Sequence, residues 1–73
     1  MSDRFKIVKC FYVDGGALFS HDVYFNPFQV ESFYSTSQIT ENGEEVSTTH
    51  VHMKSGDCLD VFMDVEDFAK MLE

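Results

Sequence analysis

The sequence predicts a β-rich α+β fold, a five-stranded antiparallel meander or half-open barrel with one short C-terminal helix. Apolar and polar residues alternate through most of the chain, turn residues separate the alternating segments, and only residues 64–73 follow a helical spacing. The 73 residues form a single domain, 1–73. A chain of this length buries only about 60% of the surface that its unfolded form exposes, so we expect support from a disulfide, a metal or self-association.

Two strands are expected in the N-terminal part of the chain, at residues 5–13 and 17–25. The first carries apolar residues on both alternating faces, which is typical of a strand in the interior of a sheet. The sequence Asp-Gly-Gly at 14–16 predicts a turn, because glycine adopts positive φ without steric cost. Pro27 ends the second strand, since it has no N–H group to donate to a neighbouring strand.

Two further strands are expected at residues 30–39 and 46–53, after a tight turn at residues 28–29. The many serine and threonine residues of 30–39 make this strand polar, so we expect it at an edge of the sheet. The two strands are joined by a hairpin turn with Asn42-Gly43 at its centre.

A fifth strand is expected at residues 58–63, after a turn that includes Gly56. A three-residue loop with glycine in the left-handed conformation sets its register against residues 46–53, and a slip of one residue would bury Asp60. The core-facing residues of the two strands are then Thr49, Val51, Met53, Leu59, Val61 and Met63. The expected cross-strand pairs are Val51 with Leu59, Thr49 with Val61, His50 with Asp60 and His52 with Cys58, the last two on the outer face.

The closing helix is expected to begin after Asp64, whose side chain caps its first turn. Glu66 and Asp67 lie in that turn, where negative charge complements the helix dipole. A helix of eight or nine residues is too short to be stable alone, so it must dock on the sheet. Its apolar stripe is formed by Val65, Phe68, Met71 and Leu72.

The chain is strongly acidic, with thirteen acidic residues against five basic ones and a formal net charge of −8. Binding to phosphate backbones needs clustered lysine and arginine, so direct binding to nucleic acid or to an anionic membrane is disfavoured. A protein partner with a basic or mixed surface is favoured. The alternative is that the charge only keeps the domain in solution.

A cytoplasmic location is expected, because the N-terminus has no apolar signal segment and no apolar run approaches the length of a membrane span. Two cysteines that are far apart, Cys10 and Cys58, fit free thiols in a reducing compartment, although one disulfide is conceivable. The eight phenylalanines and three tyrosines exceed what one sheet and one helix can cover, so we expect a homo-oligomer. The alternative is that all these rings pack in one core.

His50 and His52 form the most site-like feature, because alternation places both imidazoles on one face of a strand. With Cys58 or Asp60 as cross-strand neighbours they could bind zinc, or act as a switch near neutral pH if several chains meet there. Exposed strand histidines without a metal are the favoured interpretation, and no cofactor is expected. Neither cysteine is expected to have a basic neighbour that would make it a nucleophile, and no Ser-His-Asp spacing, phosphate-binding loop or pair of catalytic carboxylates stands out, so we expect no enzyme.

Seven residues are expected to contact a partner. The acidic ones could imitate a row of phosphates and block a basic groove, although capping and solvation explain several of them. Two aromatic residues lie on predicted outer faces, where each could anchor an interface. The seven are Tyr34, Phe62, Asp57, Asp60, Asp64, Glu66 and Asp67.

Residues 25–72 resemble the FlbD-like small flagellar proteins. The resemblance rests on the turn Phe25-Asn-Pro, on a hairpin with apolar residues flanking Gly56 and on the closing helix with Phe68 and Leu72. The sequence departs from that family in an additional hairpin at 5–25 and a longer polar hairpin around Gly43. The resemblance implies the same hairpin-plus-helix fold and supplies no catalytic residues.

Two functions from different classes follow. The first is a small, acidic, non-catalytic regulator or inhibitor that self-associates and binds a protein partner; in size and charge it resembles phage-encoded counter-defence proteins. The second is a homo-oligomer that sequesters a small nucleotide-like ligand between subunits, with bases such as Lys54 or Arg4 lining the site.

Overall fold

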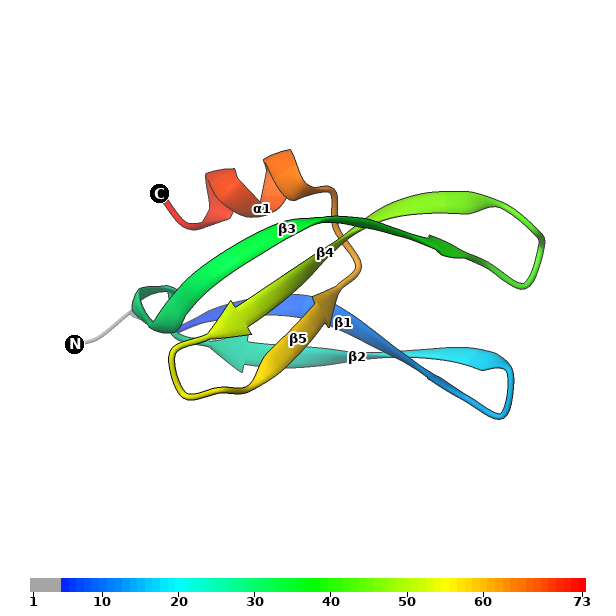
Figure 1. Cartoon of the computed structure of the whole chain (residues 1–73), viewed down its shortest axis with the longest axis horizontal. Coiled ribbons are helices and arrows are strands. Elements are labelled where there is room, and N and C mark those ends of the chain that lie inside the picture. The colour runs from blue at the N-terminus through cyan, green and yellow to red at the C-terminus, as the bar shows by residue number, and fades with distance from the viewer. Residues whose placement is uncertain (1–4) are drawn as a thin grey trace.

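The computed structural model describes residues 5–73 and shows one five-stranded antiparallel sheet with a helix against one face (Figure 1). The predicted fold class is confirmed, and the sheet stays open, because its two edge strands do not pair. Arg4 lies outside the described residues. The elements in chain order are β1 Lys6–Asp14, β2 Ala17–Phe25, a 3₁₀ turn Pro27–Gln29, β3 Val30–Ile39, β4 Glu45–Met53, β5 Cys58–Val61 and α1 Val65–Met71.

The strands lie in the order β2-β1-β5-β4-β3, so two locally formed units meet at the centre of the sheet. The consecutive strands β3, β4 and β5 form a meander, and the β1–β2 hairpin joins it where Cys10 of β1 lies opposite Val61 of β5. The interior position of β1 confirms the expectation from its apolar residues on both faces. The polar strand β3 is an edge strand, also as expected.

The register between β4 and β5 agrees with the prediction at each of its four pairs. Thr49 lies opposite Val61 and Val51 opposite Leu59, so their side chains share one face. The turn is closed by a hydrogen bond from the Gly56 N–H to the Met53 carbonyl, and Gly56 has a φ of 99°. Only glycine adopts this conformation without strain, so the turn residue and the alternating pattern specify the same register.

Both ends of β1 and the start of β4 differ from the expected bounds by one residue, and one strand end and one turn position need a physical explanation. β5 ends at Val61 and not at residue 63, because the Met63 N–H bonds the Val61 carbonyl and turns the chain towards the helix. The β3–β4 turn is not centred on Asn-Gly: the Gly43 N–H bonds the Thr40 carbonyl, so the turn lies one residue earlier. An Asn-Gly turn of type I′ needs positive φ at the asparagine, and among residues 5–73 only glycines have positive φ.

Phe68 of α1 is the centre of the core and is 0% exposed. Its ring stacks on that of Phe25, with centroids 5.7 Å apart, and meets the edge of the Phe33 ring at 5.1 Å. These contacts hold the seven-residue helix on the sheet, and Asp64 caps it by accepting a hydrogen bond from the Glu66 N–H at 3.1 Å. The buried hydrophobic cluster around Phe68 consists of Val8, Cys10, Phe25, Val51 and Val61.

The sheet therefore has two unequal faces, which we call the covered face, under α1, and the open face opposite it. Both hairpins extend past the helix, so the molecule is elongated, with extents of 41 × 23 × 21 Å (Figure 1). At the far end of the covered face the exposed rings of Tyr12 and Phe19 stack on each other at 5.5 Å. No helix within residues 5–73 has the length and apolarity that a bilayer span requires.

Candidate functional site

Side chains from three neighbouring strands meet on the open face. Because strand side chains alternate, His50 and His52 of β4 point away from the core that contains Val51. The confirmed register places Asp60 opposite His50 and Cys58 opposite His52. The pairing of β3 with β4 adds Tyr34, which lies opposite His50. We call these five residues the histidine cluster.

Short contacts connect the members of the histidine cluster. Nδ1 of His50 lies 2.7 Å from Oδ1 of Asp60, and Nδ1 of His52 lies 3.4 Å from Sγ of Cys58. The two imidazole rings meet edge to face with their centroids 4.8 Å apart. The Tyr34 ring lies beside both, at 5.3 Å from His50 and 6.1 Å from His52.

The side chains of the histidine cluster are partly exposed to solvent. The His50 side chain is 23% exposed and that of Asp60 is 48% exposed. His52 is half-buried and Cys58 is exposed. One ligand atom from each of His50, His52 and Cys58 lies within 4.8 Å of the others. The predicted outward orientation of the histidines is correct, and the arrangement offers two nitrogens and one sulfur to a small ion.

The other half of the open face, on β1 and β2, carries exposed apolar side chains around one Lys–Asp ion pair. Ile7 and Tyr24 lie opposite each other and both are exposed, Tyr24 to 71%. Phe62, expected to be a free contact residue, is half-buried and packs against Phe11, with ring centroids 5.5 Å apart. The chain turn after β5 brings Phe62 back over β1, where its N–H bonds the Lys9 carbonyl. Phe62 therefore supports this surface and presents only part of its ring.

The five acidic residues expected to form one cluster are distributed over different parts of the molecule. Asp57 lies in the turn before β5, and Asp64 caps the helix after the other end of that strand. Asp60 points to the open face, whereas Glu66 and Asp67 are exposed on α1 over the covered face. The spacing in sequence suggested a row of carboxylates, but the sheet separates its members, so a phosphate-like row of all five does not form.

The two thiols lie in opposite environments and are both free. Cys10 is buried on the covered face, where its burial and the nearby charge of Asp60 raise the pKa of its thiol to about 11. Cys58 is exposed, and its sulfur lies 3.4 Å from Nδ1 of His52, so the expectation that neither cysteine has a basic neighbour is wrong for Cys58. The expected inertness of Cys10 has a physical basis, since a buried thiol that stays protonated is a poor nucleophile.

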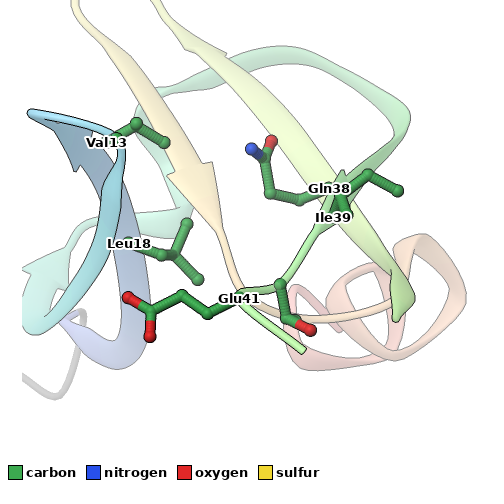
Figure 2. A pocket seen from close by; sticks show the side chains of 7 residues that line it. Val13, Leu18, Gln38, Ile39 and Glu41 are labelled. Carbon is green, nitrogen blue, oxygen red and sulfur yellow. The ribbon is translucent and has the colours of Figure 1, made fainter. Parts of the chain in front are cut away.

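Two hollows could receive a small molecule. One, of about 120 Å³, lies between the tips of the two hairpins, where Val13 and Leu18 face Gln38 and Glu41 (Figure 2). Sites for drug-sized ligands occupy roughly 300–1,000 Å³, so this hollow suits only a very small molecule. The second hollow, of about 340 Å³, is lined by six aromatic or apolar residues, three polar residues and one charged residue, Asp57.

The sequence did not reveal the contact between Tyr34 and the histidines. A turn centred on Asn42-Gly43 would have placed Tyr34 opposite Val51, which disagrees with the outer face that alternation within its own strand predicts. The turn observed one residue earlier places it opposite His50 instead. Glycine at the last position of a type I turn is the sequence signal that could have indicated this register.

Comparison with known protein families, with curated proteins and with solved structures gives no match for this chain. Function must therefore be inferred from its own surfaces.

Proposed function

We propose that this chain is a small, non-catalytic binding protein of the cytoplasm that pairs with a second copy of itself and regulates or inhibits a protein partner. The observation that carries the proposal is an excess of exposed over buried large apolar side chains. Seven hydrophobic residues among 5–73 are buried, whereas nine large ones are exposed. The exposed ones are Phe5, Ile7, Tyr12, Val13, Phe19, Tyr24, Phe28, Tyr34 and Ile39.

The apolar half of the open face suits contact with a second copy. A small domain with one helix on one face leaves the other face without a second layer, and a second sheet can pack there at about 10 Å. The charges on this half are Lys9 and Asp22, whose side chains lie 3.6 Å apart. Their charges cancel, so two copies do not repel at this surface although each chain carries −8.

Four exposed acidic residues lie outside that apolar surface, where they can meet another protein. Glu41 and Glu44 are exposed at the β3–β4 tip, and Glu66 and Asp67 are exposed on the helix. Complementary charge increases the rate of encounter and excludes acidic competitors. A partner with a basic or mixed surface is therefore favoured.

Size-exclusion chromatography with light scattering at micromolar concentration tests self-association. The wild-type chain should have the mass of a dimer, and Ile7→Glu should have that of a monomer, because it buries a charge in the apolar contact. Ser37→Glu is the matched control, since Ser37 is exposed on the covered face at the other edge of the sheet. A wild-type monomer, or an equal effect of both substitutions, would contradict the proposal.

The partner is tested by affinity capture with three baits: the wild-type chain, Ile7→Glu, and a variant with Glu41 and Glu44 changed to Gln. A specific partner should be lost from the charge-neutralised bait and weakened by added salt, because exposed charges are screened. A partner captured equally by all three baits contradicts a role for the acidic surface.

The hollow of about 340 Å³ favours a second candidate, a homo-oligomer that holds a small planar ligand. Asp57 is its charged lining residue, and Lys54 does not line it. This lining suits a neutral or cationic aromatic molecule better than a nucleotide. A thermal-shift screen discriminates, because a ligand at 100 times its Kd stabilises the folded state by about 2.7 kcal/mol.

A further inference from the structure

The side chains of His50, His52 and Cys58 combine the ligand types that zinc prefers. Imidazole nitrogen and thiolate sulfur together bind Zn²⁺ in both structural and catalytic sites, whereas oxygen-binding cations such as Mg²⁺ and Ca²⁺ avoid such a set. Zinc has no geometric preference of its own beyond the tetrahedral arrangement that four ligands adopt. The chemistry of the three side chains thus points to one class of ion.

The geometry of the cluster is close to what that ion needs. Bonds of about 2.0 Å to nitrogen and about 2.3 Å to sulfur at a tetrahedral angle place the two atoms about 3.5 Å apart. Nδ1 of His52 and Sγ of Cys58 are already 3.4 Å apart. The three ligand atoms lie within 4.8 Å of one another, so they must draw closer together to reach the spacing of a tetrahedral site.

Asp60 supplies the outer contact that metal-binding histidines commonly have. Its Oδ1 lies 2.7 Å from Nδ1 of His50, which fixes the proton on that nitrogen and leaves Nε2 with a lone pair for an ion. A hydrogen bond of this kind also orients the ring and increases the basicity of the ligating nitrogen. Asp60 acts here as a positioning residue and not as a ligand.

The backbone holds the four residues rigidly. They occur as two directly opposed pairs in the β4–β5 ladder, whose covered face is anchored by Val51 and Val61, both 0% exposed. Sites on strands are more precisely held than sites on loops. Because Cys58 is exposed, an ion can enter from solvent and a fourth ligand can be water.

We propose that His50, His52 and Cys58 bind one Zn²⁺ ion on the open face, with Asp60 orienting His50 and the fourth position open to water. The proposal concerns a single chain and does not depend on self-association or on a protein partner. It revises the expectation that these histidines are exposed strand residues without a metal.

The test uses the full chain without a histidine tag, stripped with a chelator and titrated with Zn²⁺ by calorimetry. We expect a stoichiometry of one ion per chain. His52→Ala and Cys58→Ser should each weaken binding by more than about 100-fold, because each removes a ligand. Asp60→Asn should weaken it by about 10–100-fold at unchanged stoichiometry, as loss of an outer hydrogen bond does in other sites.

The matched control is His21→Ala, which removes the remaining histidine, an exposed one on β2 outside the histidine cluster. It should bind Zn²⁺ like the wild type. Circular dichroism of every variant shows whether the sheet is retained. Co²⁺ gives an independent readout: the wild type should show thiolate-to-metal charge transfer and the visible absorption of tetrahedral Co²⁺, and Cys58→Ser should lose the charge transfer.

Two results would overturn the proposal. One is a wild-type chain that binds Zn²⁺ no more tightly than the variant with both His50 and His52 changed to Ala. The other is a folded Cys58→Ser chain with wild-type affinity and an unchanged Co²⁺ spectrum. Either result would show that the histidine cluster binds no ion and consists of two cross-strand pairs that stabilise the hairpin.

Discussion

The two faces of the sheet use the same kinds of residue in opposite ways. On the covered face Cys10 is buried among apolar side chains and Phe68 fills the centre of the core, so these groups contribute to stability. On the open face Cys58 is exposed beside a histidine and Tyr24 is exposed to 71%. The comparison teaches that position relative to the single helix, and not residue type, separates structural from functional candidates in this chain.

The largest expected effect comes from Phe68→Ala on the covered face. Replacing a fully buried phenylalanine by alanine costs about 3–5 kcal/mol, which is a large part of the stability of any small domain. We expect a chain that is largely unfolded at 25 °C, measured by circular dichroism with urea titration.

The matched change on the open face is Tyr24→Ala, made in the Ile7→Glu background so that self-association does not contribute; it removes an exposed ring and should cost less than about 1 kcal/mol. Equal losses from the two substitutions would show that the open face contributes as much packing as the covered face, and the comparison would fail.

The two thiols should differ in reactivity by about 100-fold or more. With an ordinary pKa of 9.0 raised to about 11, the Cys10 thiol has about 100-fold less thiolate below pH 9, and burial slows attack further. Iodoacetamide at pH 8 with a chelator present should modify Cys58 and leave Cys10 intact, as measured by peptide mass spectrometry.

The same cysteine provides its own control. In urea, where the chain is unfolded, Cys10 should react at the rate of an ordinary thiol. Rapid alkylation of Cys10 in the folded chain would place it outside the core.

A smaller effect is expected for a buried hydroxyl group. Thr49 is 0% exposed on the covered face, and its hydroxyl donates to the Met63 carbonyl at 2.8 Å. Thr49→Val leaves that carbonyl without this donor and should cost about 1–3 kcal/mol in urea unfolding.

The comparison pair for Thr49 lies on the other face, where the hydroxyl oxygens of Thr36 and Thr48 are 2.6 Å apart. Changing both to Val removes donor and acceptor together and should be nearly neutral. If the double change lowers the free energy of unfolding more than Thr49→Val does, the hydrogen bond of Thr49 on the covered face is not the more important of the two.

Much of the fold could be predicted because its signals are local. The strands Ala17–Phe25 and Val30–Ile39 match the expected residues, since alternation marks their length and turn residues mark their ends. The pairing of His50 with Asp60 could be predicted because Gly56 and the alternating pattern agree. The pairing of Tyr34 with His50 could not, because two turns one residue apart both satisfy the sequence around Gly43.

The sequence by itself determined the elements of this protein, the β4–β5 register and the side of the sheet to which each histidine points. These properties depend on residues fewer than about a dozen positions apart, where period-two alternation and glycine conformation are decisive. Only the tertiary structure decided that β1 pairs with β5, that the carboxylates separate and that one face of the sheet has no helix on it within residues 5–73. Those outcomes are sums of many weak contacts between distant segments, and no single residue encodes them.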